Sequence, residues 1–258
     1  MSILNLDKIF DPHRVAVIGA SDTPTSVGYT VLRNLIGSGF RGVVYPVNPK
    51  RESVQGIQAF KDIKTLPHAP DLAVICTPAV TVPGLVRELG EAGTRGLVII
   101  SAGFREIGEE GRKLERQVLE EQAKYDGMRI LGPNCLGIIV PGIHLNASFA
   151  ASTPKKGHIG FISQSGALCT SVLDWAIDEG IGFSYFANAR ALLPATAEYY
   201  DGLYAILTRV EPAKAEDYRA LRAVFPERYA TMAAHMEKAA ALARQAVDAA
   251  PSDRTIGI

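Results

Sequence analysis

Short apolar runs that alternate with helix-like segments are the feature that most constrains the fold of this chain. Each run is long enough for one strand, and the segments between the runs have apolar residues at helical spacing. The predicted strands are residues 15–19, 43–47, 72–76, 96–100, 129–131 and 159–162, and the clearest predicted helices are residues 27–36, 80–92 and 109–125. Apolar strands that alternate with helices form parallel sheets covered on both faces. We therefore expect an α/β fold with a Rossmann-like, doubly wound parallel sheet.

The sequence changes character at about Asn188. Beyond this point it is rich in alanine, has apolar positions at helical spacing, and contains no further buried-strand run. We predict an α-helical tail of unknown role for residues 188–258.

Charge and cysteine content exclude several classes of protein. The chain has 27 basic and 27 acidic residues, so no overall charge directs it to nucleic acid or to an anionic membrane. Cys76, Cys135 and Cys169 form no Cys-x-x-Cys pair and have no histidine cluster beside them, which indicates reduced thiols and no zinc site. The first residues carry charges instead of the apolar core of a signal peptide, and no stretch of about eighteen apolar residues occurs. We expect a cytoplasmic location.

The turns that follow the predicted strands are candidate sites, because ligands of doubly wound sheets bind beyond the carboxyl ends of the strands. The first turn runs from Gly19 through Ser21 to a predicted helix start near Ser26. Free backbone N–H groups at a helix start can bind a phosphate. The turn lacks the Gly-x-Gly-x-x-Gly pattern, which weakens the case for a dinucleotide. Alternatively, Ser26 is only a helix N-cap and the turn binds no ligand.

The end of the second predicted strand carries two basic residues, Lys50 and Arg51. Sites for NAD usually have an acid at this point, which binds the ribose hydroxyls. Two cations suit an additional phosphate on the ribose instead, as in coenzyme A (CoA) or NADP. A solvated basic loop without a ligand is the alternative.

Later strand ends add further candidates. Thr77 and Pro78 follow the third predicted strand, and small residues surround Ser101 after the fourth. Such turns leave room for an extended ligand, but they also meet the steric needs of tight strand-to-helix turns. The fifth strand runs into a Gly- and Pro-containing loop with Asn134 and Cys135. This loop is either a structural turn or part of a binding site, and the sequence favours neither interpretation. Cys135 has no basic neighbour in the sequence that would activate its thiol, so we do not expect a nucleophile there.

Ser163, Ser165 and Gly166 form a second candidate phosphate-binding turn, between the last predicted strand and a helix that ends near Glu179. Their hydroxyl groups, the free N–H groups and the positive end of the helix dipole together could hold a phosphate or a phosphorylated side chain. A simple N-cap role for Ser163 or Ser165 is the alternative. The Gly-x-Ser-x-Gly pattern is absent around Ser165, which argues against a Ser-His-Asp triad.

Seven segments across residues 10–186 together resemble the NDP-forming acyl-CoA synthetases, a family that includes the α subunit of succinyl-CoA synthetase and the ADP-forming acetate–CoA ligases. The segments are FDPHRVAVIGAS, GYTVLRNL, GVVYPVNPK, DLAVICTPA, VIISAGFRE, RILGPNCLGI and IGFISQSGALCTSVLDWAIDEGIGFSYF. The resemblance implies a CoA-binding Rossmann-like domain at residues 1–145 and the start of a flavodoxin-like domain at residues 146–187, truncated before the helical tail at residues 188–258.

The resemblance also implies roles for the residues at the strand ends. Ser21 and the turn towards Ser26 would face the CoA phosphates, and Lys50 would lie by the nucleotide end of CoA. The implied CoA-binding residues are Gly19, Ser21, Ser26, Val27, Lys50, Thr77, Pro78, Ile100, Ser101, Ala102 and Asn134. The implied phosphate-binding residues are Ser163, Ser165 and Gly166.

Members of this family join an acid to CoA with ATP, through a phosphorylated histidine, and the sequence pattern around that histidine is not found in this chain. We therefore expect a CoA-binding protein of the acid–thiol ligase family that is either non-catalytic or dependent on a partner, and we assign a catalytic role to no residue and expect no metal. The resemblance implies an ATP-grasp β subunit or domain as the partner, through which ATP or ADP would act, and an oligomer.

Two other functions are compatible with the same residues. An NADP-dependent oxidoreductase on a Rossmann fold would use the first turn and the Lys50-Arg51 pair, although no proton donor with a partner is evident. A non-catalytic scaffold would retain only a vestigial CoA pocket.

Overall fold

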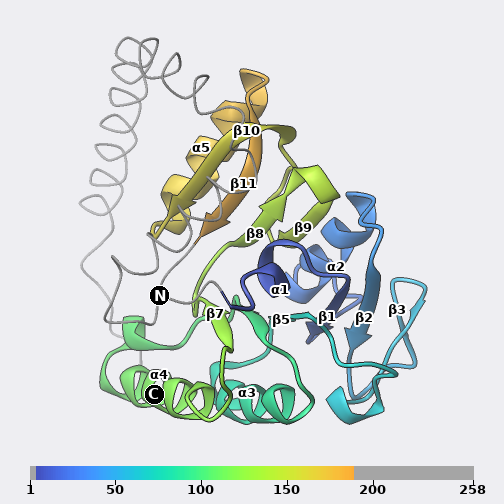
Figure 1. The fold of residues 1–258 in the computed structure, drawn as a ribbon, viewed down its shortest axis with the longest axis vertical. Helices are drawn as coiled ribbons and strands as arrows, with labels where there is room; N and C mark the ends of the chain where they lie inside the picture. The colour runs from blue at the N-terminus through green and yellow to red at the C-terminus, as the bar shows by residue number, and fades with distance from the viewer. Residues whose placement is uncertain (1–3, 189–258) are drawn as a thin grey trace, which may run out of the picture. The chain divides into compact units, whose positions relative to one another are not determined.

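The computed structural model describes residues 4–188, which lie in one compact unit (Figure 1). The predicted helical tail lies outside the described residues, apart from its first residue, Asn188. The described part has the expected α/β fold, with a Rossmann-like parallel sheet followed by a second sheet of mixed direction.

The first sheet contains five parallel strands in the order β2-β1-β5-β6-β7. The strands are β1 (Arg14–Ile18), β2 (Val43–Val47), β5 (Leu72–Ile75), β6 (Gly96–Ile99) and β7 (Arg129–Leu131). The strands predicted for this sheet are confirmed, with bounds that differ by one residue or none. The chain runs outward from β1 first to β2 and then in the other direction to β5, so the switch point of the sheet lies between β1 and β5.

Helices cover both faces of this sheet (Figure 1). They are α1 (Asp7–Phe10), α2 (Val27–Gly37), α3 (Val82–Glu91) and α4 (Glu109–Gln122). Ala16 and Ile18 of β1 belong to the core beneath α3 and α4, while α2 lies on the opposite face. The alternate residues Val15 and Val17 are also fully buried. Burial on both faces explains why β1 reads as an unbroken apolar run.

Short elements fill the connections. A two-stranded hairpin follows β2, and single turns of 3-10 helix occur at four places within residues 4–188. These elements are β3 (Ser53–Val54), β4 (Ile57–Gln58), η1 (Ile63–Thr65), η2 (Ala79–Thr81), η3 (Arg105–Ile107) and η4 (Pro141–Ile143). The helix predicted at residues 80–92 begins as η2 and continues as α3, because Pro83 has no N–H with which to continue one helix through this region.

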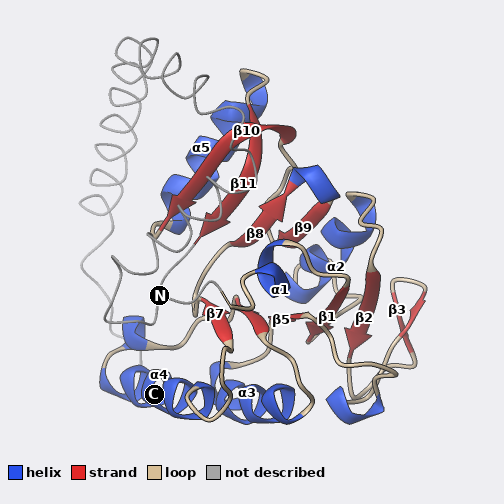
Figure 2. Ribbon diagram, in the orientation of Figure 1, coloured by secondary structure: helices blue, strands red, loops and turns tan. Residues whose placement is uncertain are grey.

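The second sheet has the order β10-β11-β8-β9 (Figure 2). Its strands are β8 (Gly137–Val140), β9 (Leu145–Ser148), β10 (Lys155–Ser163) and β11 (Gly182–Asn188), and α5 (Gly166–Asp178) connects β10 to β11. The strand predicted at residues 159–162 is part of β10, whereas β8 and β9 were not predicted. The domain boundary between residues 145 and 146 stays a prediction, and it falls at the first residue of β9.

Side-chain contacts join the second sheet to the helices of the first. The side-chain amide of Asn34, on α2, donates to the carbonyl oxygens of Ser148 at 2.9 Å and Ala150 at 2.8 Å. Phe10 packs edge-on against Tyr185 of β11, with ring centroids 5.4 Å apart. These contacts fix the second sheet relative to the helix that begins at the first candidate turn.

Candidate functional site

The turns that follow the five parallel strands meet at one edge of the first sheet. Backbone hydrogen bonds connect each turn to its neighbour, which makes the edge one continuous surface. These bonds run from Gly19 N to Val47 O (3.0 Å), Cys76 N to Ile18 O (2.9 Å), Ile100 N to Ile75 O (3.0 Å) and Asn134 N to Ser101 O (3.0 Å). The structure therefore brings the predicted residues of all five turns to the same edge.

The turn between β1 and α2 places a helix start directly against the end of a strand. Gly19 has a φ of 88°, a conformation that favours glycine, and a Cβ on Gly28 would overlap the carbonyl oxygen of Gly19. Ser26 is the N-cap of α2, and its hydroxyl oxygen accepts from the N–H of Tyr29 at 3.2 Å. The cap proposed from the sequence is confirmed. It leaves the N–H groups of Val27 and Gly28 without an intrahelical partner, as at any helix start.

Two side chains that the sequence analysis missed hold this turn in place. Asn48, at the end of β2, donates to the carbonyl oxygen of Ala20 at 2.8 Å. Gln55, in the β3–β4 hairpin, donates to the carbonyl oxygens of Ser21 at 3.2 Å and Tyr29 at 3.0 Å. No local pattern marks either residue, because each partner lies more than 25 positions away in the sequence.

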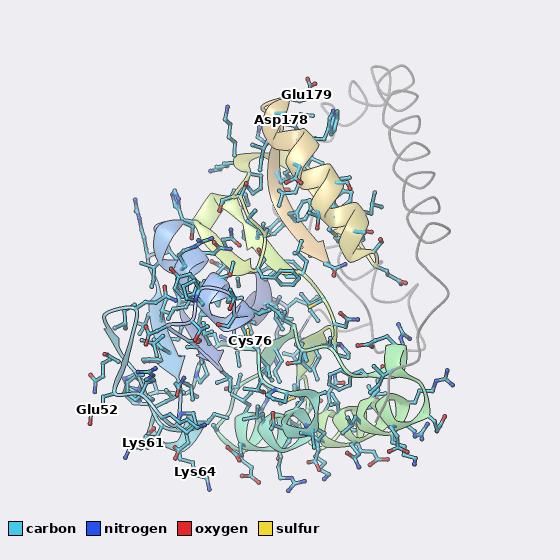
Figure 3. The ribbon with its side chains drawn as sticks, turned by 180° about the vertical axis from the view of Figure 1, so that it is seen from behind. Glu52, Lys61, Lys64, Cys76, Asp178 and Glu179 are labelled. Atoms are coloured by element: carbon cyan, nitrogen blue, oxygen red, sulfur yellow. The ribbon has the colours of Figure 1, made fainter. Side chains whose placement is uncertain are left out.

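Lys50 lies on the turn after β2, with its side chain exposed. Its N–H donates to the side-chain oxygen of Asn48 at 2.8 Å, so the side chain that anchors the β1 turn also fixes the backbone of Lys50. Arg51 and Glu52 continue the exposed turn, and Glu52 lies at its outer side in Figure 3. The exposed cation agrees with a site for a phosphate and equally with a solvated loop.

Thr77 and Pro78 lie on the turn after β5, at the switch point of the sheet. The hydroxyl groups of Thr77 and Thr81 are 2.8 Å apart, and Thr81 donates to the carbonyl oxygen of Pro78 at 2.8 Å. The side chain of Val80 on the same turn is 73% exposed. This part of the edge therefore offers a polar wall and an uncovered apolar residue to a ligand.

The turns after β6 and β7 pack against each other. The Ser101 hydroxyl is buried and donates to the carbonyl oxygen of Ile75 at 3.3 Å, whereas Ala102 is exposed. Asn134 is half-buried and has a φ of 54°. Ser101 thus joins the turn after β6 to the end of β5, and its hydroxyl proton is already used in this hydrogen bond.

The thiols on this edge are not set up as nucleophiles. Burial raises the pKa of Cys76 and of Cys135 to about 12, and the Cys135 thiol donates to the carbonyl oxygen of Ile99 at 3.3 Å. A thiol with so high a pKa is protonated at neutral pH, which agrees with the prediction that Cys135 is not a nucleophile.

The second candidate turn joins β10 to α5. Ser165 is the N-cap of α5 and accepts from the N–H of Leu168 at 3.2 Å, while the Ser163 hydroxyl accepts from the N–H of Ser165 at 3.1 Å. The side chain of Ser165 is exposed and Ser163 is buried. The acidic residues Asp178 and Glu179 lie at the other end of the helix, as Figure 3 shows. The helix start is therefore open to an anion, as its dipole favours.

Asn188 connects this second turn to the turn that carries Asn134. Its side-chain oxygen accepts from the N–H of Leu136 at 2.7 Å, and its side-chain amide donates to the carbonyl oxygen of Ser163 at 2.8 Å. The residue is 1% exposed. The two groups of predicted site residues therefore adjoin each other across one buried asparagine, which the sequence analysis did not single out.

Within residues 4–188, no group of three or more His, Cys, Asp or Glu side chains is placed to hold a metal ion. No helix in the same range is long and apolar enough to cross a membrane.

Two family models match this chain. The model described as the CoA binding domain matches residues 13–141, and that described as the succinyl-CoA ligase like flavodoxin domain matches residues 156–190. The first match includes all five turns of the first sheet, and the second includes the turn before α5.

Curated relatives agree with these matches. The chain is 49% identical over 183 residues to the alpha subunit of ADP-forming acetate–CoA ligase II of Pyrococcus furiosus. The matched region covers 71% of this chain and 39% of that protein. The chain is 45% identical over 179 residues to ADP-forming acetate–CoA ligase I of Archaeoglobus fulgidus, covering 69% of this chain and 26% of that protein. The chain therefore spans less than two fifths of the length of these two relatives.

Solved structures show the same architecture. A protein from Pyrococcus horikoshii superposes with a TM-score of 0.70 at 46% identity, over 75% of this chain and 44% of that one. The dinucleotide-forming acetyl-coenzyme A synthetase 1 of Candidatus Korarchaeum cryptofilum, solved with phosphate and ADP, superposes with a TM-score of 0.68 at 37% identity, over 72% and 40% of the two chains.

Proposed function

Because this chain belongs to the NDP-forming acyl-CoA synthetase family and carries its CoA-binding domain, we propose that it binds coenzyme A along the carboxyl edge of the five-stranded sheet. One observation carries the proposal. The open start of α2 and the exposed cation of Lys50 lie on neighbouring turns that Asn48 holds together. CoA carries a pyrophosphate and a separate ribose phosphate, so it needs two anion-binding positions of this kind.

The pyrophosphate of CoA is assigned to the start of α2. The N–H groups of Val27 and Gly28 lie at the start of α2, where they have no intrahelical partner, and Ser21 precedes them on the same turn. Gly19 and Gly28 let the strand end and the helix start meet without intervening side chains. Lys50 then binds the ribose phosphate from the next turn, as a charge-assisted contact.

The remainder of CoA is assigned to the turns after β5, β6 and β7. Thr77, Pro78, Ile100, Ser101 and Ala102 would line its path, through backbone groups and small side chains more than through the occupied Ser101 hydroxyl. Its thiol end would then reach Asn134 and, across Asn188, the start of α5.

The start of α5 is proposed as the phosphate-binding position of the reaction. Ser163, Ser165 and Gly166 would hold the phosphate of an acyl phosphate beside the CoA thiol. The sulfur would bond to the acyl carbon while the carbon–oxygen bond to phosphate breaks, and the departing phosphate would take up the thiol proton, which is the final step of making an acyl-CoA. We assign no catalytic side chain within residues 4–188 to this step.

The nucleotide and the phosphate carrier are proposed to come from a partner component. Two supporting facts are the alpha-subunit names of relatives and the small share of those proteins that this chain spans. ATP or ADP would act only through such a partner, and this chain with its partner would form an oligomer.

The test of CoA binding is a calorimetric titration of the full chain with CoA, dephospho-CoA and NADP. We expect CoA to bind most tightly, and Lys50→Ala to weaken it by about 1–3 kcal/mol, roughly five- to a hundredfold, because one charge-assisted phosphate contact is lost. Dephospho-CoA should show little further loss in the variant. Lys64→Ala is the matched control, since Lys64 is exposed on η1, outside the turns of the carboxyl edge.

Other outcomes identify the alternatives. Tighter binding of NADP than of CoA would favour an oxidoreductase. If none of the three ligands binds, the CoA pocket is vestigial, and the result favours a non-catalytic scaffold. Unchanged CoA affinity in Lys50→Ala would show that the ribose phosphate lies elsewhere.

A further inference from the structure

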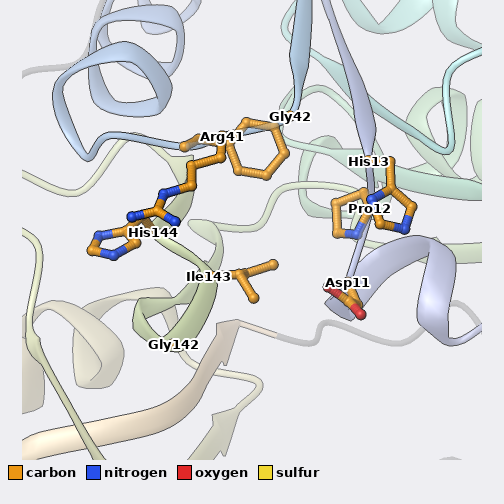
Figure 4. Close-up of a pocket in the computed structure, with 9 residues that line it drawn as sticks. Asp11, Pro12, His13, Arg41, Gly42, Gly142, Ile143 and His144 are labelled. Carbon is orange, nitrogen blue, oxygen red and sulfur yellow. The ribbon is translucent and has the colours of Figure 1, made fainter.

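A cavity of about 380 Å³ opens at the amino edge of the five-stranded sheet, opposite the edge assigned to CoA (Figure 4). Residues 11–13, just before β1, and residues 40–42, just before β2, form two of its walls, and residues 142–144, around the end of η4, form the third. Cavities of roughly 300–1,000 Å³ are typical of sites for small molecules. Neither the family match nor the CoA proposal assigns a ligand here.

Basic side chains gather on one side of this cavity. Arg41 and His144 lie beside each other in Figure 4, although they come from different segments of the chain. Lys156 does not line the cavity but lies next to its third wall, since its Cε lies 3.9 Å from where a Cβ on Gly142 would be. Within residues 4–188, Arg41 and Lys156 form no ion pair. The cations are therefore available to a ligand.

The other side of the cavity is less basic. His13 and Asp11 lie there in Figure 4, and Asp11 is the one carboxylate among the described lining residues. Ile143 lies between the two sides and is half-buried, as is Phe40. A ligand that fills the cavity would thus meet cations at one end and apolar side chains along its body.

The walls are held in place before any ligand binds. The Ser38 hydroxyl donates to the carbonyl oxygen of His144 at 2.6 Å, and the N–H of Val43 donates to the carbonyl oxygen of His13 at 2.9 Å. A Cβ on Gly42 would overlap both the Phe40 ring and the carbonyl oxygen of His13. A site that is already ordered loses less entropy on binding than a mobile one.

We propose that this cavity is a second ligand site, for a small organic anion that carries a carboxylate or a phosphate on an apolar body. The oxyanion binds between Arg41 and His144, where the planar guanidinium can donate two parallel hydrogen bonds. The apolar body lies along Ile143 and Phe40. Because the site is at the opposite edge of the sheet, its ligand does not compete with CoA.

The test is a calorimetric titration of the full chain with benzoate, AMP and inorganic phosphate, each with and without saturating CoA. Benzoate and AMP represent the two kinds of organic anion, and we expect at least one of them to bind more tightly than inorganic phosphate. Its affinity should be the same with and without CoA. Arg41→Gln should weaken it roughly tenfold or more.

A variant with the opposite expected effect separates the proposal from damage to the fold. Asp11→Asn removes the one acidic group of the described lining, so anion binding should strengthen about two- to fivefold. Lys64→Gln is the control, with no expected effect on these probes. The CoA affinity of Arg41→Gln should equal that of the unaltered chain, whether or not the assignment of Lys50 holds.

Four results would overturn the proposal. They are no binding of benzoate or AMP, binding of inorganic phosphate as tight as that of the organic anions, displacement by CoA, and anion affinity unchanged in both Arg41→Gln and Asp11→Asn. Loss of AMP binding in Lys50→Ala, with Arg41→Gln unaffected, would place AMP at the CoA edge.

Discussion

The side chain of Asn188 satisfies two backbone groups that belong to different parts of the candidate site. Leu136 N–H comes from the turn after β7, and Ser163 C=O comes from the turn before α5. The amide group supplies one acceptor and one donor, and an asparagine can do both at once. Because the residue is buried, water cannot replace either bond.

We predict that Asn188→Leu lowers the free energy of unfolding of the full chain by about 2–4 kcal/mol, because two buried polar groups lose their partners. Urea unfolding followed by circular dichroism measures the change. Gln164→Leu is the control, since Gln164 is an exposed neighbour of the same turn, and it should change stability by less than about 0.5 kcal/mol. Equal stability of Asn188→Leu and the unaltered chain would show that the two hydrogen bonds of the Asn188 side chain do not stabilise the fold.

At the residue scale, the sequence predicted the positions that follow a strand but not the side chains that fix them. Ser26 and Ser165 were recognisable because an N-cap acts within three residues of its own position. Asn188 and Gln55 act over 25 residues or more. No single sequence without homologues reveals contacts over such distances.

At the scale of elements, the close approach of α2 to the end of β1 forms the proposed phosphate site. The contact needs a residue without a side chain at Gly28, whose added Cβ would overlap the carbonyl oxygen of Gly19. A helix displaced from this position would move the N–H groups of Val27 and Gly28 away from the turn.

We predict that Gly28→Ala lowers the free energy of unfolding by about 1–3 kcal/mol through overpacking, and that it also weakens CoA binding. Thermal unfolding and calorimetric titration measure the two effects. Gly37→Ala is a matched control on the same helix, because nothing lies within 4 Å of its added Cβ, and alanine there should be neutral or stabilising by up to about 1 kcal/mol. If the two variants behave alike, the close contact does not control the site.

Most of the elements that the sequence revealed are ones whose burial shows in their composition, although β8, which is buried and apolar throughout, was not predicted. β1 and β5 are apolar at nearly every position, and both were predicted. β9 is equally buried but contains Asn146 and Ser148, whose side chains bond to each other at 2.6 Å. A buried strand whose polar side chains bond to each other and to Thr153 does not read as an apolar run, so periodicity alone could not reveal β9.

At the scale of the whole molecule, one buried carboxylate ties the N-terminal segment to the amino edge of the sheet. Asp71 accepts from the ammonium group of Lys8 at 3.2 Å and from the N–H groups of His13 at 3.1 Å and Arg14 at 3.0 Å. Burial alone would raise the pKa of the Asp71 carboxyl, but the hydrogen bond and charge of Lys8 and the two N–H groups outweigh it, so the pKa is lowered.

The sign of the resulting pH dependence follows from that shift. A carboxyl whose pKa is lower in the folded chain binds its proton more readily when the chain unfolds, so acid favours unfolding. The stability that Asp71 contributes is fully present above the ordinary pKa of an aspartate, about 4. It is lost as the pH falls through the lower pKa of the folded state.

We therefore predict that Asp71→Asn lowers the free energy of unfolding by about 1–3 kcal/mol at pH 7, because the pair with Lys8 and a charge-assisted contact to the backbone are lost. The difference from the unaltered chain should shrink as the pH falls below about 4, because the unfolded chain then binds a proton at Asp71 more readily than the folded chain does. Urea unfolding at a series of pH values measures this difference. Asp126→Asn, at an exposed position, is the control and should change stability at pH 7 by less than about 0.5 kcal/mol. A difference between Asp71→Asn and the unaltered chain that stays constant from pH 7 to pH 3 would mean that the shape of the asparagine, and not the lost charge, causes the destabilisation.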